Sequence, residues 1–424
     1  MVVLIGSFFV AVVFGIPISV AIGLSAVLYL VLFSGVSLAV VAQQMTLGID
    51  SFPLLAIPLF LLAGLVMSEA DITTRLIRFA NALVGRVAGG LAMVMVISCM
   101  LFGAISGSGV ADVTAIGSLM LPAMEKQGYR KGLSASLLGC AGSLGTIIPP
   151  SIVMIILGVT TGTSIGKLYL GGVIPGVFTG VCLMALSWFY AKRMHLPPGE
   201  PFAIGKAVTA FREAFLSLLT PVIIIGGIVS GAFTATEAAA VASVYALILG
   251  LFVYRSLTVR QLPSIFLRVA ETTGVILFII AAAALFGWIL AAEQIPQRLA
   301  AFFLSITNNY YLLLVFINVL LLILGIFMET IAIIIIVVPV LMPLVTGLGM
   351  DPIHFGVMVT LNMAIGANTP PVGVDLIAAC KVGRTSLDEA LPYILPFVSA
   401  MAVALAFITF IPQIVTILPN AFMK

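Results

Sequence analysis

Charged side chains are scarce in this sequence, since Asp, Glu, Lys and Arg make up 8% of its 424 residues. That scarcity excludes an ordinary soluble domain. The four cysteines stand singly in apolar runs and the two histidines accompany no nucleophile, so we expect no metal cluster and no enzyme. The chain lacks the phosphate loop G-x-x-x-x-G-K-[ST], and it is therefore not expected to hydrolyse ATP. A net charge of +3 is too small to indicate a nucleic-acid partner.

Apolar residues dominate instead: they form 62% of the chain, and the mean hydropathy is +1.32. Repeated apolar stretches of about 20 residues are long enough to cross a lipid bilayer as helices. The sequence therefore predicts an all-α, polytopic membrane protein. The apolar start has no basic segment and no cleavage site, so we expect retained spans rather than a signal peptide. Residues 2–36 form either one span or two.

The chain contains an internal repeat. The shift that places Pro149 on Pro370, which we call the repeat shift, superimposes four prolines of the first half on four of the second. It also superimposes several glycines, including Gly145 on Gly366, and it places Pro150 on Pro371. We expect four regions: N-terminal scaffold spans (1–50), a first repeat (51–195), a central scaffold with a membrane-surface amphipathic stretch (196–271), and a second repeat (272–424).

The distribution of Lys and Arg predicts that the two repeats are inverted. Basic residues of the first repeat belong in the cytoplasm by the positive-inside rule, whereas the equivalent loop of the second repeat, around Asp351, has none. Five predicted crossings separate the two loops, an odd number. Inverted repeats in secondary transporters place substrate and ions where paired broken helices meet. The first cytoplasmic group comprises Arg75, Arg78, Arg86, Lys126, Arg130 and Lys131.

Each repeat has a polar interruption that predicts a re-entrant hairpin. In the first, "FGAISGSGVAD" places Ser106 and Ser108 at the tip. The repeat shift makes "GIFMETIA" the second tip, with Glu329 and Thr330 as candidate sodium-binding residues. Unwound backbone at this depth survives where it lines a cavity, and its carbonyl groups suit a hard cation such as sodium.

The Pro-Pro pairs predict a second interruption in each repeat, because two successive prolines end a helix. The half-helix after the break presents a positive dipole end to a substrate carboxylate, and the half-helix before it presents carbonyl groups to a cation. Asn362, Asn368 and Thr369 offer polar side chains beside the second break, and we predict that Asn362 and Asn368 contact the substrate.

Several acidic residues lie in apolar surroundings, where an ionised carboxylate needs a partner. Glu329 either contacts an ion or substrate directly or accepts hydrogen bonds from hairpin backbone. Asp375 either contacts substrate or, as we slightly favour, pairs with Lys381. We expect Asp112 to cap the helix after the first tip, and Glu237 to cap a later helix.

The strings "GSLGTIIPPS", "FTATEAAAVASVYAL" and the run from Phe327 to Gly373 resemble the large membrane subunit of TRAP transporters, the tripartite ATP-independent periplasmic family. The resemblance covers essentially the whole chain. It implies an elevator-type transporter of the bacterial inner membrane that imports an organic acid with sodium. It also implies two partners, a small four-helix membrane subunit and a periplasmic substrate-binding protein. Because the chain starts at its first span, we expect the small subunit to be a separate polypeptide.

The resemblance also assigns site residues. It implies a first sodium motif at Ser106, Ser108, Gly145 and Pro149, and a second at Gly325, Gly366, Thr369 and Pro370. Polar groups near Ser108, Asn362 and Asp375 would face the substrate, which the sequence leaves open among C4-dicarboxylates, sialic acid and other carboxylates. We expect no cofactor besides the coupling ion Na+.

Three alternatives remain open at this stage. A self-sufficient sodium/dicarboxylate carrier of related architecture would work without a binding protein. A channel would carry current without a sodium gradient. An intramembrane enzyme would need a nucleophile or metal constellation that the sequence does not offer.

Overall fold

The computed structural model describes residues 2–85, 87, 89–196, 203–307 and 309–423, and Arg86 lies outside this part. Within the described residues there is no strand, and nearly all of the chain is helical. The prediction of an all-α protein is confirmed.

Among the described residues, seven helices are long and apolar enough to cross a membrane, or eight if one bent pair counts as a single span. This confirms the prediction of a polytopic membrane protein. The seven are Phe52–Glu69, Ile165–Arg193, Ile204–Val229, Ala235–Val253, Val259–Ala292, Tyr310–Phe327 and Leu387–Phe410.

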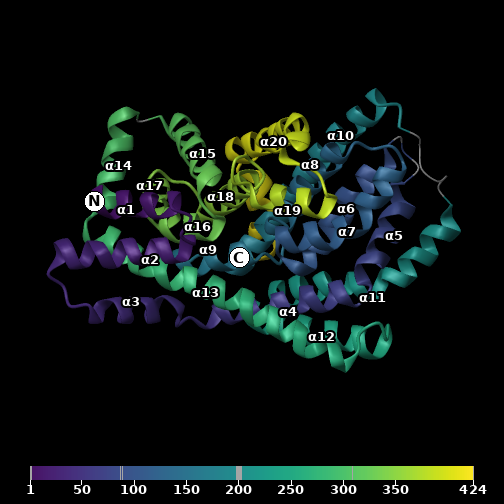
Figure 1. The fold of residues 1–424 in the computed structure, drawn as a ribbon, viewed down its shortest axis with the longest axis horizontal. Coiled ribbons are helices and arrows are strands. Elements are labelled where there is room, and N and C mark those ends of the chain that lie inside the picture. Colours follow the sequence, from purple (N-terminus) through teal and green to yellow (C-terminus); the bar gives the residue numbers. More distant parts are fainter. Residues whose placement is uncertain (1, 86, 88, 197–202, 308, 424) are drawn as a thin grey trace.

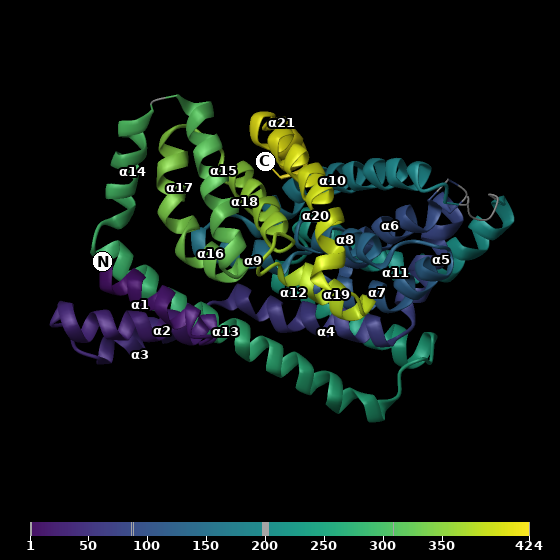
Figure 2. The same ribbon diagram turned by 45° about the horizontal axis from the view of Figure 1, so that its top comes forward.

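One group of helices forms a layer along one side of the molecule (Figures 1 and 2). Its longest member, α13, packs against α2, α3 and α4, while α12 packs against α4. We call this group the scaffold. It comprises α1 (Val2–Val13), α2 (Ile18–Tyr29), α3 (Ala39–Ile49), α4 (Ala56–Glu69), α11 (Ile204–Val229), α12 (Ala235–Ile248) and α13 (Leu262–Ala292).

The remaining helices lie above this layer in Figure 2 and form two successive sets, which together we call the body. The first set is α6 (Gly90–Ser106), α7 (Gly109–Lys126), α8 (Lys131–Gly142), α9 (Ile152–Thr161) and α10 (Ile165–Arg193). The second is α15 (Tyr310–Phe327), α16 (Thr330–Ile336), α17 (Val338–Gly347), α18 (Pro352–Gly366), α19 (Val374–Gly383), α20 (Leu387–Phe410) and α21 (Gln413–Phe422). Amphipathic α5 (Ile72–Val84) and α14 (Ile295–Ile306) precede the sets.

Helix boundaries follow the sequence repeat. Helices α7 and α8 begin at Gly109 and Lys131, and the repeat shift carries these positions to Thr330 and Pro352, where α16 and α18 begin. Each Pro-Pro pair falls in a gap between helices, after α8 in the first set and after α18 in the second. The same spacing of residues thus produces the same order of elements twice.

The two sets differ in the helix that follows the hairpin tip. In the first set α7 continues through Pro122, but its counterpart is bent by 53° between α16 and α17. The bend lies at Val337, two residues before Pro339, which has no equivalent in the first set. A proline removes a backbone donor and disfavours helical geometry at the residue before it.

The structure gives more detail on two scaffold segments, the N-terminal apolar stretch and the amphipathic stretch of the central scaffold. The N-terminal apolar stretch forms two helices, α1 and α2, which pack against each other and are separated at Gly15 and Pro17. The described part of the amphipathic stretch that we predicted includes the first part of α11, which runs unbroken for 26 residues. Because a helix rises about 1.5 Å per residue, α11 is longer than the hydrocarbon core is thick.

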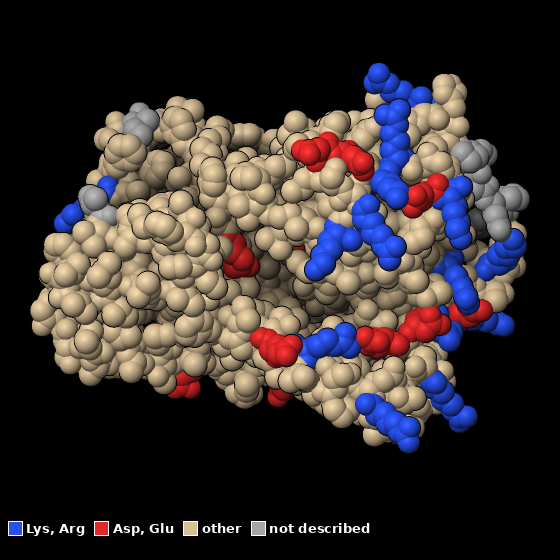
Figure 3. Space-filling model, viewed as in Figure 1, with Lys and Arg blue, Asp and Glu red and all other residues tan. Residues whose placement is uncertain are grey.

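Basic side chains gather at one end of the long axis, where α5 and the start of α11 lie (Figures 1 and 3). The opposite end carries few of them in this view. An uneven distribution of this kind is what the positive-inside rule predicts for one face of a membrane protein.

Glycine contacts hold each hairpin against the broken helix of its own set. A Cβ atom added to Gly103 would lie 2.6 Å from the Cα atom of Gly145, and one added to Gly366 would lie 2.9 Å from that of Gly325. Small residues allow this close approach of helices within membranes. The first helix of each hairpin therefore packs directly on the end of the helix before the Pro-Pro pair.

We expect Gly366→Ala to destabilise the protein by about 1–3 kcal/mol, because the added methyl group meets backbone that cannot move aside. Gly226→Ala is the matched control, since nothing lies within 4 Å of the added atom. Thermal unfolding of the two purified variants measures the difference. Equal melting temperatures would contradict the packing described.

Candidate functional site

The two hairpin tips have equivalent geometry. Ser108 is the N-cap residue of α7, and Glu329, its equivalent under the repeat shift, is the N-cap residue of α16. One carboxylate oxygen of Glu329 accepts hydrogen bonds from the backbone N–H groups of Ile331 at 2.9 Å and Ala332 at 3.3 Å. Glu329 therefore has the structural role that we considered for it, and its other oxygen accepts no hydrogen bond from the residues that the structure describes.

The first tip contacts the first Pro-Pro segment directly. The backbone N–H of Ile152 donates to the carbonyl of Gly107 over 3.2 Å, and a Cβ atom on Gly107 would lie 2.6 Å from the carbonyl oxygen of Pro150. Gly107 also has a φ of +65°, which glycine adopts without strain. The tip thus requires glycine for both its conformation and its contact.

A cavity of about 160 Å³, the central cavity, lies where the two tips meet the second broken helix and the scaffold. From the sequence-predicted set it unites six residues: Ser108, Gly325, Glu329, Thr330, Gly366 and Asp375. Leu61 of α4 and Thr272 and Ile276 of α13 contribute the scaffold wall. The cavity thus lies between the body and the scaffold.

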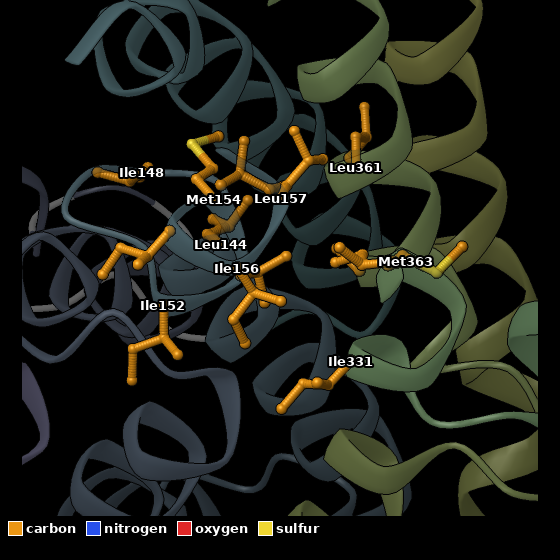
Figure 4. Close-up of a cluster of buried hydrophobic side chains, with 14 of the residues drawn as sticks. Leu144, Ile148, Ile152, Met154, Ile156, Leu157, Ile331, Leu361 and Met363 are labelled. Atoms are coloured by element: carbon orange, nitrogen blue, oxygen red, sulfur yellow. The ribbon is translucent and has the colours of Figure 1, made fainter. Parts of the chain in front are cut away.

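A cluster of buried apolar side chains joins the two sets of helices beside this cavity. In Figure 4, side chains of α9 face side chains of α16 and α18. Burial of apolar area contributes roughly 25 cal/mol per Å² for folding in water, and within a bilayer close packing takes over that role. The labelled members are Leu144, Ile148, Ile152, Met154, Ile156, Leu157, Ile331, Leu361 and Met363.

A second cavity of about 620 Å³ adjoins the first and shares Leu61, Ser108, Val110 and Thr272 with it. It lies between α4 and the first hairpin, and its wall includes an ion pair in which Arg268 donates to Glu69 over 2.8 Å. Ser106 lines this second cavity. The two cavities together reach from the charged part of the scaffold to the hairpin tips.

Asp112 does not cap α7, contrary to our expectation. It is fully buried, and the Ser106 hydroxyl donates to its Oδ1 atom. Its Oδ2 atom has no hydrogen-bond partner among the described residues and lies against Gly103 and Gly145, where a Cβ atom would collide with it. An unpaired carboxylate oxygen in this position is a ligand of the kind that a hard cation requires. Its intramembrane position was the sequence signal for such a role.

Asp375 does not pair with Lys381, the partner that we slightly favoured, which is exposed at the other end of α19. Its Oδ2 atom instead accepts a hydrogen bond from the Ser143 hydroxyl over 2.7 Å. Asn368 donates to the same hydroxyl, and all three side chains are buried. Ser143 thus connects the first break to the second. No motif in the sequence predicted this contact.

Asn362 and Asn368, predicted as substrate contacts, are not among the residues that line the central cavity. Asn362 is fully buried and donates to the Oδ1 atom of Asn318 on α15 over 2.7 Å. Its position on α18 turns it toward α15, whereas its neighbour Met363 lines the cavity. We therefore assign Asn362 to helix packing.

The remaining predicted residues lie close to the breaks but outside the central cavity lining. Pro149 and Gly145 are buried in the first break, and Thr369 and Pro370 are part of the second. The Thr369 hydroxyl donates to the carbonyl of Ile365 over 2.8 Å, which leaves its oxygen able to accept or to coordinate. The prediction that Glu237 caps a helix is confirmed, because Glu237 forms a capping box with Thr234 at the start of α12.

This fold and site define a polytopic helical membrane protein with two repeat-related broken helices around one cavity, the architecture of a membrane transporter. Residues 5–414 match the family described as "Tripartite ATP-independent periplasmic transporter, DctM component". The chain therefore belongs to this family, and it is a multi-pass protein of the bacterial inner membrane.

Curated relatives are similar over most of the chain. The sialic acid TRAP transporter large permease protein SiaM of Vibrio cholerae is 41% identical and covers 96% of both chains. The C4-dicarboxylate TRAP transporter large permease protein DctM of Pseudomonas aeruginosa is 42% identical over 94% of both. The isethionate TRAP transporter permease protein DctMQ of Oleidesulfovibrio alaskensis is 41% identical over 97% of this chain and 65% of its own length.

Among solved structures, the YdaH transporter of Alcanivorax borkumensis matches with a TM-score of 0.58. The match covers 89% of this chain and 90% of that one at 15% identity. At this identity the match supports the fold alone.

We expect Asn362→Ala to destabilise the protein by roughly 1–3 kcal/mol, because it leaves the Asn318 amide oxygen buried without a donor. Any effect of Na+ on the melting temperature should persist in this variant, since Asn362 does not reach the cavity. Asn420→Ala, at an exposed position of α21, controls for loss of an amide. A folded Asn362→Ala protein that has lost a sodium response seen in the parent would reinstate the predicted site role.

Proposed function

We propose that this chain imports an organic acid by sodium-coupled secondary transport, and that the body carries the acid past the scaffold in an elevator movement. The observation that carries this proposal is the central cavity, which places both hairpin tips and the second helix break against two scaffold helices. Secondary transporters bind substrate and ions where paired broken helices meet.

Sodium coupling is supported by the oxygen atoms around the breaks. The unpaired Oδ2 atom of Asp112 lies beside Gly145 and near the Ser106 hydroxyl, in the first predicted sodium motif. In the second repeat Gly325 and Gly366 touch at the equivalent place, and both line the central cavity together with Glu329. Hard cations take carboxylate, hydroxyl and carbonyl oxygen ligands. We therefore propose one sodium site in each repeat.

The cargo and partners follow from family membership. Relatives are named for sialic acid, C4-dicarboxylates and isethionate, which are all organic acids. We propose that a periplasmic binding protein delivers an acid of this class, and that a small four-helix membrane subunit packs on the scaffold. The self-sufficient carrier is the alternative that the experiment must exclude.

The direct test reconstitutes the chain with its small subunit in liposomes and adds the binding protein loaded with labelled acid. The acid is chosen as the one that raises the melting temperature of the binding protein. We expect uptake to require an inward Na+ gradient and to stop when choline replaces sodium. Uptake without the binding protein would favour the self-sufficient carrier, and uptake without sodium would contradict coupling.

We expect Ser108→Ala and Thr369→Ala to weaken the apparent sodium affinity of uptake about ten- to a hundredfold, the effect of removing one oxygen that contacts a charge. The sodium dependence of the initial uptake rate measures this. Thr360→Ala is the control for Thr369, because both hydroxyls donate to the carbonyl four residues earlier on α18. Ser118→Ala is the control for Ser108→Ala. Unchanged sodium dependence in both site variants would rule out these sites.

A further inference from the structure

The central cavity has an unusual charge for a site that receives an acid. The charged residues of its lining are Glu329 and Asp375, and the lining includes no Lys, Arg or His. Figure 3 shows acidic atoms in the hollow near the middle of the face, with Lys and Arg gathered to one side of it. A purely anionic cargo would therefore meet like charge and no basic partner.

Asp375 is held with one oxygen available to the cavity. Its Oδ2 atom accepts the hydrogen bond from Ser143, whereas its Oδ1 atom accepts none from the described residues. The Oδ1 atom is also not sealed inside the protein, unlike Oδ2 of Asp112. Asp375 is 4% exposed, so the carboxylate is more than nine-tenths buried and what remains faces the cavity.

Two helix starts lie beside this carboxylate. Asp375 lies in the first turn of α19, and Gly109, the first residue of α7, lies against it, since a Cβ atom on Gly109 would be 2.6 Å from Oδ2. Helix N-termini stabilise nearby negative charge. The glycine leaves room for the carboxylate, and no basic side chain of the cavity lining neutralises it.

Asp375 has no equivalent acidic residue in the first repeat, unlike the glycines and prolines that occur in both repeats. Glycines and prolines recur under the repeat shift, but the acids do not: Asp375 corresponds to Met154, and Asp112 corresponds to Ile333. Glu329 corresponds to Ser108. Asp375 also lies outside both predicted sodium motifs, and it lines the central cavity that the proposed cargo would enter.

We propose that Asp375 is a specificity-determining residue that receives a cationic nitrogen of the cargo. The transported acid would then be zwitterionic, with an ammonium or similar group placed at Asp375 and its own carboxylate directed to the hairpin and broken-helix backbone. This inference rests on the proposed function and narrows its substrate class. A buried carboxylate is costly to leave unpaired, and a cationic nitrogen supplies a charge-assisted hydrogen bond.

The test measures thermal stability of the purified full chain with two matched pairs of probes at saturating NaCl. Aspartate and succinate share a carbon skeleton and differ by one ammonium group, as do β-alanine and propionate. We expect the ammonium-bearing member of at least one pair to stabilise the parent protein at concentrations about tenfold lower or more, the effect of one ionic hydrogen bond. Asp375→Asn should abolish that preference while still accepting the Ser143 hydrogen bond.

Asp388→Asn is the matched control, because it removes an acid from the first turn of another helix at an exposed position. It should keep the preference of the parent. No preference in either pair, or a preference that survives in Asp375→Asn, would overturn the proposal.

A sodium titration without any organic acid tests whether Asp375 binds Na+ rather than a cationic nitrogen of the cargo. If Asp375→Asn lowers the steepness or affinity of the sodium response, Asp375 binds a coupling ion and the assignment to cargo is overturned. If the parent protein shows no sodium response at all, the proposed sodium coupling fails instead. If parent and variant respond to sodium alike while the ammonium preference is lost, the assignment to cargo stands.

Discussion

The structure depends on one constraint: backbone without helical hydrogen bonds must be shielded from lipid. This chain has four such places at the site, two hairpin tips and two Pro-Pro segments. Each is shielded by another member of the set, because Gly103 packs on Gly145, Gly325 packs on Gly366, and Gly107 bonds to Ile152. The internal repeat produces this arrangement directly, because the same glycine contact between a hairpin and a broken helix occurs once in each repeat.

The same constraint explains why the cavity forms where it does. Tips and breaks bring together polar groups that have no place elsewhere in an apolar body, and the scaffold closes the remaining side with Leu61, Thr272 and Ile276. Ser143 connects the two breaks through Asp375 and Asn368, so hydrogen bonds join the two repeats at the site. A body joined in this way can move as a whole against an apolar surface without exposing its polar interior to lipid.

Sequence reasoning succeeded where a residue type has a local consequence. Two prolines end a helix wherever they stand, and a polar, glycine-rich string inside an apolar run predicts a break, so the tips at Ser108 and Glu329 and both Pro-Pro gaps were predictable. It failed where the outcome depends on which way a side chain faces. Asn362 turns toward Asn318, Asp375 toward Ser143 and Asp112 toward Ser106, and helical spacing alone does not fix such contacts between distant segments. The sequence also did not indicate that the amphipathic stretch and the following span share one continuous helix, α11.

The central claim is that the body moves as one unit relative to the scaffold when ions bind. Spin labels at Val244 of α12 and Leu395 of α20, both exposed, report the distance between scaffold and body, and labels at Leu119 of α7 and Leu395 report a distance within the body. Pulsed electron paramagnetic resonance in lipid nanodiscs, with the native cysteines replaced, measures both distances with and without Na+. The account predicts that the first distance distribution changes with sodium while the second does not. A first distance that never changes, or a second that changes as much, would contradict it.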